Sequence, residues 1–224
     1  MNHPLTLRLA IALLTLMPLA GCMSHSTWGD PTFSPDSSRL CYVQTDVLAE
    51  MVVDGKIWSQ AFTLHWRDVD NPETHQHVRF GSSGRGYSVS PDAKWSPDGS
   101  RIGVVTDGKL VIVDANSGTK QTFGHGHIRS FTWITEEQLA YLTIEASGGE
   151  EQLALWREDV ATQQATEIRT FPGQASPFQD AHWSPSGEFV ILMPQLGSEP
   201  FYCINLQDGT TRTFGIPSHE EIGV

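Results

Sequence analysis

Two pairs of histidines, each separated by one residue, are the residues whose spacing first suggests chemistry in this sequence. They are His75 with His77 and His125 with His127. Alternate residues of a β-strand share one face, so either pair could place two imidazoles on one metal ion. Neither pair has a carboxylate or a third histidine at a recognisable ligand spacing, and isolated pairs often arise by chance. We therefore predict exposed polar residues at strand edges, with no metal site and no cofactor.

Three serines, Ser34, Ser96 and Ser184, each precede a proline and lie in copies of one short phrase. A serine nucleophile of the hydrolase type lies instead in a Gly-x-Ser-x-Gly elbow, and phosphate binding uses a glycine-rich loop. The sequence contains neither pattern. We therefore assign these serines to turns and predict no catalytic residue.

The phrase recurs four times as a divergent repeat. Each copy is followed by an apolar run, a polar gap and a second apolar run. The copies are Phe33-Ser34-Pro35-Asp36, Trp95-Ser96-Pro97-Asp98-Gly99, Phe131-Thr132-Trp133-Ile134 and Trp183-Ser184-Pro185-Ser186-Gly187. Each unit ends on a phenylalanine: Phe80, Phe123, Phe171 and Phe214. A period of roughly 45 residues is typical of propellers and solenoids.

The second unit shows the plan of one repeat most plainly. Pro97, Asp98 and Gly99 form a turn, because proline presets φ, aspartate bonds nearby amides and glycine tolerates positive φ. Asp107-Gly108 is a typical hairpin turn. The strands expected around these turns cover residues 93–95, 102–105, 110–113 and 119–123. We therefore predict an all-β protein, a β-propeller of about four four-stranded antiparallel blades, either closed or an open arc.

The Trp-Ser-Pro-Asp-Gly turn, with the strands and the Gly-Thr or Gly-Lys turn that follow it, resembles the repeat of the TolB-type β-propellers. The resemblance covers residues 27–216. Residues 134–137 replace the Pro-Asp-Gly turn in the third unit, and residues 46–56 are an insertion in the first. TolB itself carries an extra α/β domain and more blades than this length holds. The resemblance therefore implies the fold and not identity with TolB.

The N-terminus reads as a leader for export. Arg8 precedes an apolar run at residues 9–19, and Leu19-Ala20-Gly21-Cys22 follows. The run is too short to span a bilayer, and small residues mark a cleavage site. The last four residues resemble the lipobox of bacterial lipoproteins, in which the cysteine is diacylated and becomes the first residue. The resemblance implies a lipid on Cys22.

These features divide the chain into a lipoprotein signal peptide (1–21), a lipidated N-terminus with a short tether (22–30), a propeller (31–216) and a C-terminal tail (217–224). Met23 and Ser24 follow the cysteine in place of aspartate, which in the lipoprotein family implies the outer membrane. We therefore expect an exported lipoprotein on the periplasmic face of that membrane.

The net charge indicates which kinds of molecule the protein can bind. The chain has 14 basic and 26 acidic residues, a net charge of −12. An acidic surface disfavours nucleic acid and anionic lipid headgroups. We therefore expect an envelope protein partner, with the membrane reached through the lipid alone.

Two cysteines remain after Cys22, in the first and last units of the repeat. Cys41 aligns with Gly103, Ala140 and Val190, which suggests a tight position in the core. The first and last blades of a closed ring are neighbours, so a Cys41–Cys203 disulfide is compatible with export to an oxidising compartment. We favour two buried free thiols, because a bridge requires Cα atoms within about 7 Å.

The propeller geometry indicates where binding would occur. Turns after first and third strands share one rim, whereas the irregular loops after second and fourth strands share the other. Variable loops on a rigid scaffold are the usual place for binding. The predicted partner-binding residues on this irregular rim are Val47, Leu48, Met51, Val52, His125 and His127.

Our leading interpretation is therefore a non-enzymatic, lipid-anchored scaffold for protein interactions. The alternatives are a propeller hydrolase or lyase with its site in the central funnel, and a purely structural envelope module. We also predict that Trp95 and Trp183 are buried between blades.

Overall fold

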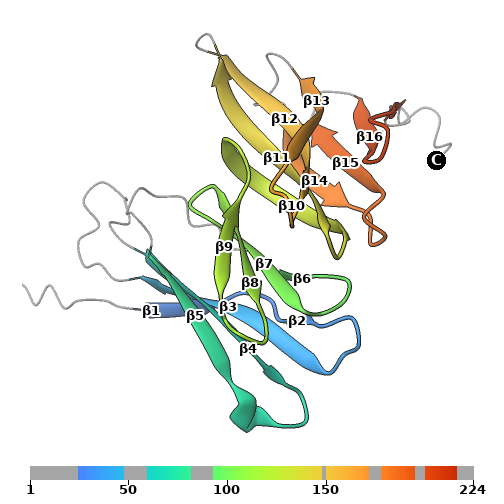
Figure 1. Ribbon diagram of the computed structural model, residues 1–224. Helices are drawn as coiled ribbons and strands as arrows, with labels where there is room; N and C mark the ends of the chain where they lie inside the picture. The colour runs from blue at the N-terminus through green and yellow to red at the C-terminus, as the bar shows by residue number, and fades with distance from the viewer. Residues whose placement is uncertain are drawn as a thin grey trace, which may run out of the picture.

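The computed structural model describes residues 25–47, 60–81, 93–147, 150–171, 178–194 and 200–215. Within these ranges the protein is all-β, apart from one 3-10 turn, and it forms four antiparallel sheets (Figure 1). The leader with Cys22, and the predicted binding residues Leu48, Met51 and Val52, lie outside the described residues. No helix in the described part of the chain is long and apolar enough to cross a membrane.

Each sheet is one blade of the predicted propeller, with its strands in chain order. Blade 1 holds β1 (His25–Trp28), β2 (Thr32–Phe33), β3 (Arg39–Val47), β4 (Gln60–Asp68), η1 (Pro72–Thr74) and β5 (Gln76–Gly81). Blade 2 holds β6 (Ala93–Trp95), β7 (Arg101–Thr106), β8 (Lys109–Asp114) and β9 (Lys120–Phe123). Blade 3 holds β10 (His127–Thr135), β11 (Gln138–Ser147), β12 (Glu150–Asp159) and β13 (Ala165–Phe171). Blade 4 holds β14 (Phe178–Trp183), β15 (Phe189–Pro194), β16 (Phe201–Asn205) and β17 (Thr211–Phe214).

The repeated phrase forms the turn that joins the first two strands of a blade. In blade 2 the Ser96 hydroxyl donates to the Asp98 carboxylate at 2.6 Å and accepts from the Arg101 amide at 2.9 Å. Gly99 has a φ of +69°, which a side chain would strain. The three serines are therefore turn residues, as predicted from the sequence.

Blade 3 joins its first two strands by a shorter turn without Pro-Asp-Gly, in which only Glu136 and Glu137 lie between the paired residues Thr135 and Gln138. There the Thr135 hydroxyl accepts a hydrogen bond from the Glu137 amide at 3.2 Å, in the manner of a Ser/Thr turn. The Glu137 carbonyl accepts from the Val160 amide at 2.8 Å, which ties the turn to the end of β12. Local side-chain bonding thus replaces the missing proline and glycine.

Three apolar cores lie between consecutive blades, and each blade therefore has two faces. We call the face toward the preceding blade its leading face and the face toward the following blade its trailing face. At every internal junction a tryptophan on the leading face donates its indole N–H to the first strand of the preceding blade. The pairs are Trp95 with the Thr32 carbonyl (3.1 Å), Trp133 with the Lys94 carbonyl (3.1 Å) and Trp183 with the Ser130 hydroxyl (2.6 Å).

The predicted burial of the two tryptophans holds in part. Trp95 is buried in the core between blades 1 and 2. Trp183 packs against the core between blades 3 and 4 but is only half-buried.

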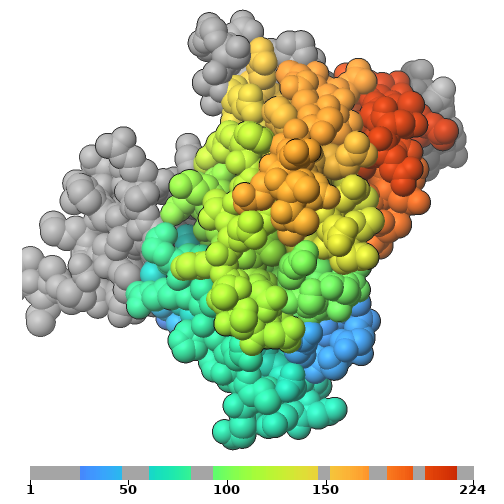
Figure 2. All heavy atoms as spheres, in the orientation of Figure 1, coloured from blue at the N-terminus to red at the C-terminus, as the bar shows by residue number. Residues whose placement is uncertain are grey.

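Blades 1 and 4 lie at opposite ends of an open arc (Figures 1 and 2). Two expectations about the ends of the repeat need correction. Strand β1 pairs with β3, so residues 25–28 of the expected tether belong to blade 1, whose inner edge is shared by β1 and β2. In blade 4, Trp183 pairs with Val190 as Trp95 pairs with Ile102, so the residue equivalent to Gly103 is Ile191 and not Val190.

Candidate functional site

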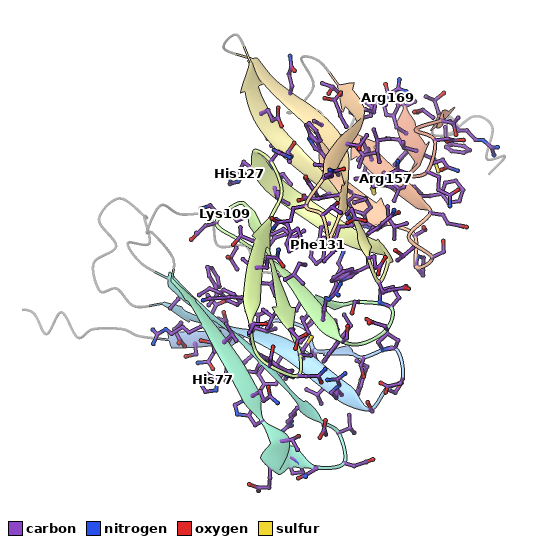
Figure 3. All side chains as sticks on the ribbon, in the orientation of Figure 1. His77, Lys109, His127, Phe131, Arg157 and Arg169 are labelled. Atoms are coloured by element: carbon purple, nitrogen blue, oxygen red, sulfur yellow. The ribbon has the colours of Figure 1, made fainter. Side chains whose placement is uncertain are left out.

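Part of the predicted irregular rim is described at the junction of blades 2 and 3, whereas residues 48–59, 82–92, 148–149, 172–177 and 195–199 of its other loops lie outside the described residues. The hairpin turn between β7 and β8 meets the loop between β9 and β10, where the Ile128 amide donates to the Gly108 carbonyl at 2.8 Å. The His127 ring lies directly over Gly108, whose missing side chain leaves it room. Lys109 and His127 accordingly lie close together in Figure 3.

Both histidines of the second pair are exposed on this rim. The His125 ring lies 5.3 Å from the Trp156 ring at an interplanar angle of 37°. The Trp156 indole in turn donates to the Thr143 hydroxyl at 3.1 Å, which holds the indole in place. The rim therefore presents two exposed imidazoles, one beside a held indole and the other over Gly108.

The opposite rim is made of turns whose polar groups bond to one another. Asp98 accepts from the Ser96 and Ser100 hydroxyls, and Asp114 accepts from the Ser117 amide and hydroxyl. Hydrogen bonds from Ser34 and Ser38 likewise lower the pKa of Asp36 to about 2. These turns stabilise the blades and leave their carboxylates satisfied without a ligand.

The first histidine pair belongs to a cluster that the sequence pattern did not reveal. His65 in β4 pairs across the hairpin with His77 in β5, and His75 lies at the end of the short 3-10 turn. The rings of His65 and His75 stack at 5.0 Å, and their nitrogens Nδ1 and Nε2 lie 2.8 Å apart. The Tyr42 ring stacks on the other side of His65 at 5.1 Å.

This cluster lies on the leading face of blade 1, which none of the described blades precedes. Trp28 in β1 meets Tyr42 edge to face at 5.5 Å and is 61 % exposed. Burial, followed by the nearby His75 and His77, lowers the pKa of His65 below its ordinary value. Histidines, cysteines and carboxylates of the described residues form no group of three arranged to hold a metal ion.

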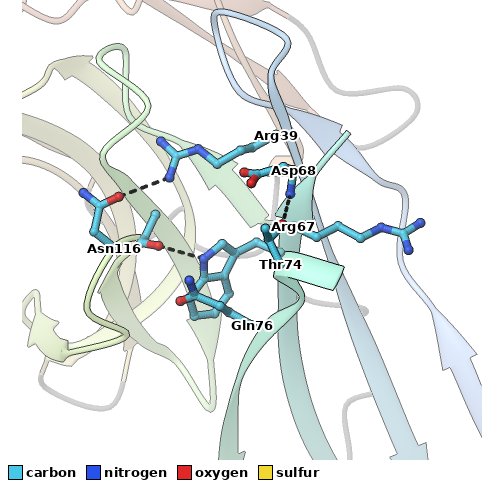
Figure 4. Close-up of a pocket in the computed structure, with 8 residues that line it drawn as sticks. Arg39, Arg67, Asp68, Thr74, Gln76 and Asn116 are labelled. Carbon is cyan, nitrogen blue, oxygen red and sulfur yellow. Dashed lines mark hydrogen bonds between the residues drawn. The ribbon is translucent and has the colours of Figure 1, made fainter. Parts of the chain in front are cut away.

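A shallow pocket of about 260 Å³ opens between blades 1 and 2 on the rim of the stereotyped turns (Figure 4). Its polar side chains are engaged in the junction: the Arg39 guanidinium reaches Asn116 at 3.4 Å, and the Trp66 indole donates to the Ala115 carbonyl at 2.8 Å. Arg67 extends away from the other lining residues in Figure 4. Pockets that enclose a small molecule are usually larger, at about 300–1,000 Å³. We therefore assign this pocket to the blade junction.

The two remaining cysteines are free thiols, as favoured from the sequence. Cys41 is fully buried, and burial raises the pKa of its thiol to about 11. Cys203 is only half-buried, in the last blade. The open arc explains why no bridge forms, since the first and last blades are not neighbours.

The predicted binding residues therefore divide into two groups. The backbone of Val47 ends strand β3 on the irregular rim, opposite His25 of β1, and His125 and His127 lie on the same rim. The structure thus gathers these three residues at one side of the arc. Leu48, Met51 and Val52 belong to the connection that follows β3, outside the described ranges, so their role stays a prediction.

No protein-family model matches the sequence, and no curated protein matches it. Solved structures do share its fold. Oligogalacturonate lyase from Vibrio parahaemolyticus is 13 % identical with a TM-score of 0.60, over 85 % of this chain and 54 % of the lyase. Acylaminoacyl peptidase from Pyrococcus horikoshii is 14 % identical with a TM-score of 0.56, over 84 % of this chain and 32 % of the peptidase.

A third similar structure is the β-propeller domain of the Trilobed protease from Pyrococcus furiosus, which has an open velcro topology. It is 16 % identical with a TM-score of 0.54, and the match covers 85 % of this chain and 58 % of that domain. The chain thus spans between a third and little more than half of these proteins. At such low identity the comparisons establish the propeller fold of this chain and nothing finer.

Proposed function

We propose that this protein is a lipid-anchored scaffold that binds an envelope protein through its irregular rim. The observation that carries the proposal is the contrast between the two rims. One rim is built from turns that satisfy their own hydrogen bonds, whereas the other presents His125 and His127 on a rigid support beside Gly108. Binding residues are disproportionately found on such loops of a rigid scaffold.

The position of β1 adds an orientation to this proposal. His25 pairs with Val47, so the chain enters the first blade at the irregular rim. Cys22 lies three residues upstream of His25, a reach of about 10 Å for an extended chain. A lipid on Cys22 would therefore hold the irregular rim toward the bilayer. The expected partner is accordingly an integral or lipid-anchored protein of the outer membrane, on its periplasmic face.

The chemistry of the rim suits a protein surface. Aromatic residues are enriched in protein interfaces, and the Trp156 ring, with the His125 ring tilted against it, supplies such a residue at this rim. The insertion after β3 adds Leu48, Met51 and Val52, which directly follow Val47 in the sequence. Apolar residues in a long connection are costly to expose unless they pack on the scaffold or on a partner.

Capture of partners from detergent-solubilised envelope tests the proposal. The double variant His125→Ala/His127→Ala should lose the recovered partners, whereas Asn116→Ala/Gln207→Ala, with both residues exposed on the opposite rim, should retain them. Equal recovery by both variants would place binding elsewhere. In parallel, Cys22→Ala should abolish incorporation of labelled fatty acid, and a wild-type chain that takes up none would remove the lipid anchor from the proposal.

The second candidate is a propeller hydrolase or lyase, which the likeness to a lyase and a peptidase favours. One observation counts against an enzyme. The carboxylate of Glu158, beside Tyr141 inside the junction of blades 2 and 3, is only 3 % exposed, so a substrate cannot reach it. Incubation with oligogalacturonate and with a blocked peptide, followed by mass spectrometry, tests this class. Cleavage of either would favour the enzyme over the scaffold.

A further inference from the structure

The phenylalanines that close the four repeats differ sharply in exposure. Phe80, Phe123 and Phe171 are 5 %, 3 % and 6 % exposed, because the following blade covers each of them. Phe214 occupies the same position in blade 4 and is 53 % exposed. The trailing face of blade 4 therefore keeps an apolar residue that is buried only where another blade follows.

The opposite end of the arc shows the complementary pattern. Phe33 pairs with Leu40 in blade 1 as Trp95 pairs with Ile102 in blade 2, so the two aromatics are equivalent. Trp95 is 8 % exposed against the preceding blade, whereas Phe33 is 58 % exposed. The leading face of blade 1 thus carries an aromatic side chain with no preceding blade to receive it.

One contact at the internal junctions shows how these ends would fit together. The Arg39 guanidinium on the trailing face of blade 1 lies over the Trp95 ring of blade 2, 5.1 Å from its centroid. The residue equivalent to Arg39 in blade 4 is Phe189, because Ser184 bonds its amide as Ser34 bonds that of Arg39. Phe189 is also exposed. A junction between blade 4 and blade 1 would therefore replace the cation–π contact by a Phe189–Phe33 aromatic pair.

The centre of the trailing face of blade 4 is apolar as well. Ile191 is exposed and pairs with Cys203, which in turn pairs with Arg212. Cross-strand partners share one side of a sheet, so these side chains lie together with Phe189 and Phe214. An apolar centre beside an arginine is the composition found in protein interfaces.

We propose that a second copy of this chain covers both end faces, head to tail, so that two four-bladed arcs close into one eight-bladed ring. Blade 4 of each copy would pack against blade 1 of the other, which repeats the junction already formed three times within the chain. A single heterologous contact closes into a ring when its rotation matches, and closed propellers have up to eight blades.

A second copy is the occupant we favour because one chain carries both halves of the missing junction. A self-complementary dimer through blade 4 alone would leave Phe33 and Trp28 exposed in both copies. The histidine cluster of blade 1 would lie at the outer edge of the closed interface, where polar residues are usual.

Mass measurement in solution is the first test. The full chain, purified from membranes in detergent, should sediment as a dimer at micromolar concentration. Phe33→Arg and Phe189→Arg should each yield monomers with unchanged circular dichroism, because both side chains are exposed in the single arc. Ala161→Arg is the matched control: Ala161 is an exposed apolar residue on the β12–β13 turn of the internal blade 3, away from both end faces, and its variant should stay dimeric. A monomeric wild-type chain would overturn the proposal.

Cross-linking with a short bis-maleimide distinguishes the arrangement of the copies, in a Cys203→Ser background. Phe33→Cys mixed with Phe189→Cys should give cross-linked dimers, whereas either variant alone should give none. Cross-linked dimers from one variant alone would indicate a self-complementary dimer. A ladder of higher masses from the double variant Phe33→Cys/Phe189→Cys would indicate an open filament. Either result would contradict the ring. If these tests refute the ring, the proposal that the irregular rim binds a partner still stands, because partner capture by the His125 and His127 variant tests it separately.

Discussion

Replacement of Trp95 by alanine should measure how much one blade junction contributes to stability. The Trp95 side chain is buried in the core between blades 1 and 2, donates to the Thr32 carbonyl at 3.1 Å and lies beneath the Arg39 guanidinium. Truncation of a buried tryptophan costs about 3–5 kcal/mol. We expect Trp95→Ala to lower the free energy of unfolding by this amount, a large share of the roughly 5–15 kcal/mol typical of a domain.

Two further variants separate the components of this loss. Trp95→Phe keeps a ring in the junction but removes the indole N–H, and it should cost about 1 kcal/mol for the lost hydrogen bond. Phe33→Ala changes the equivalent residue of blade 1, where no blade precedes it, and it should leave the stability of the single arc almost unchanged. The comparison isolates the effect of burial at one repeat position.

Urea unfolding followed by tryptophan fluorescence and circular dichroism is the assay. With a slope of about 2 kcal/mol per M, Trp95→Ala should lower the midpoint by about 1.5–2.5 M. Coincident curves from both signals are required before a free energy is assigned, because stacked repeats can unfold in parts. An equal loss in Trp95→Ala and Phe33→Ala, measured at low protein concentration, would refute the assignment of the junctions.

Three further outcomes are expected. Gly103→Val should destabilise the chain by about 1–3 kcal/mol through overpacking, because an aromatic ring of blade 3 occupies the space of the missing side chain; Gly81→Val, with open space around it, is the control in the same melting experiment. In the monomeric Phe33→Arg variant, whose blade 4 is uncovered, a maleimide should label Cys203 well before the fully buried Cys41, as read by mass spectrometry after proteolysis; equal rates would contradict the packing. Because the pKa of His65 is lowered in the fold, the unfolded chain binds more protons, so stability should fall as the pH drops below about 6.5, and His65→Gln should flatten that fall in urea titrations between pH 8 and 5.

The turns and strands of a blade were predictable because their causes are local. The Ser96-Pro97-Asp98-Gly99 turn bonds within itself and fixes the hairpin wherever it occurs. The same locality explains why a blade could be counted even where Glu136 and Glu137 replace the turn, since apolar runs still flank it.

The histidine cluster could not be read from spacing alone, because its members meet through strand pairing. His65 and His77 lie opposite each other in the β4–β5 hairpin, and their distance along the sequence carries no ligand pattern. Pairing the two predicted strands about the turn near Asn71 would have brought them together. The split inner edge of blade 1 was missed for a similar reason, as β1 was expected in the tether.

Closure of the propeller also lies beyond a local pattern. The angle between blades depends on the volumes that meet at each junction, such as Gly103 against the Phe131 ring. In blade 4 the equivalent residue is the larger Ile191, which is exposed and has no neighbouring blade among the described residues. The sequence could therefore predict four blades without deciding between a ring and an arc.

The position of strand β1 connects the two proposals. The symmetry axis of a head-to-tail ring of two arcs runs along the propeller axis, so equivalent rims of both copies face the same side. Both chains enter at the irregular rim, where His25 pairs with Val47. A ring would therefore carry two lipidated cysteines on one side and hold its irregular rims toward the same bilayer. In a dimer formed through blade 4 alone, a different axis relates the two copies, and its symmetry would not place both irregular rims on the same side. The ring is thus the arrangement in which dimerisation and anchoring support binding at the same rim.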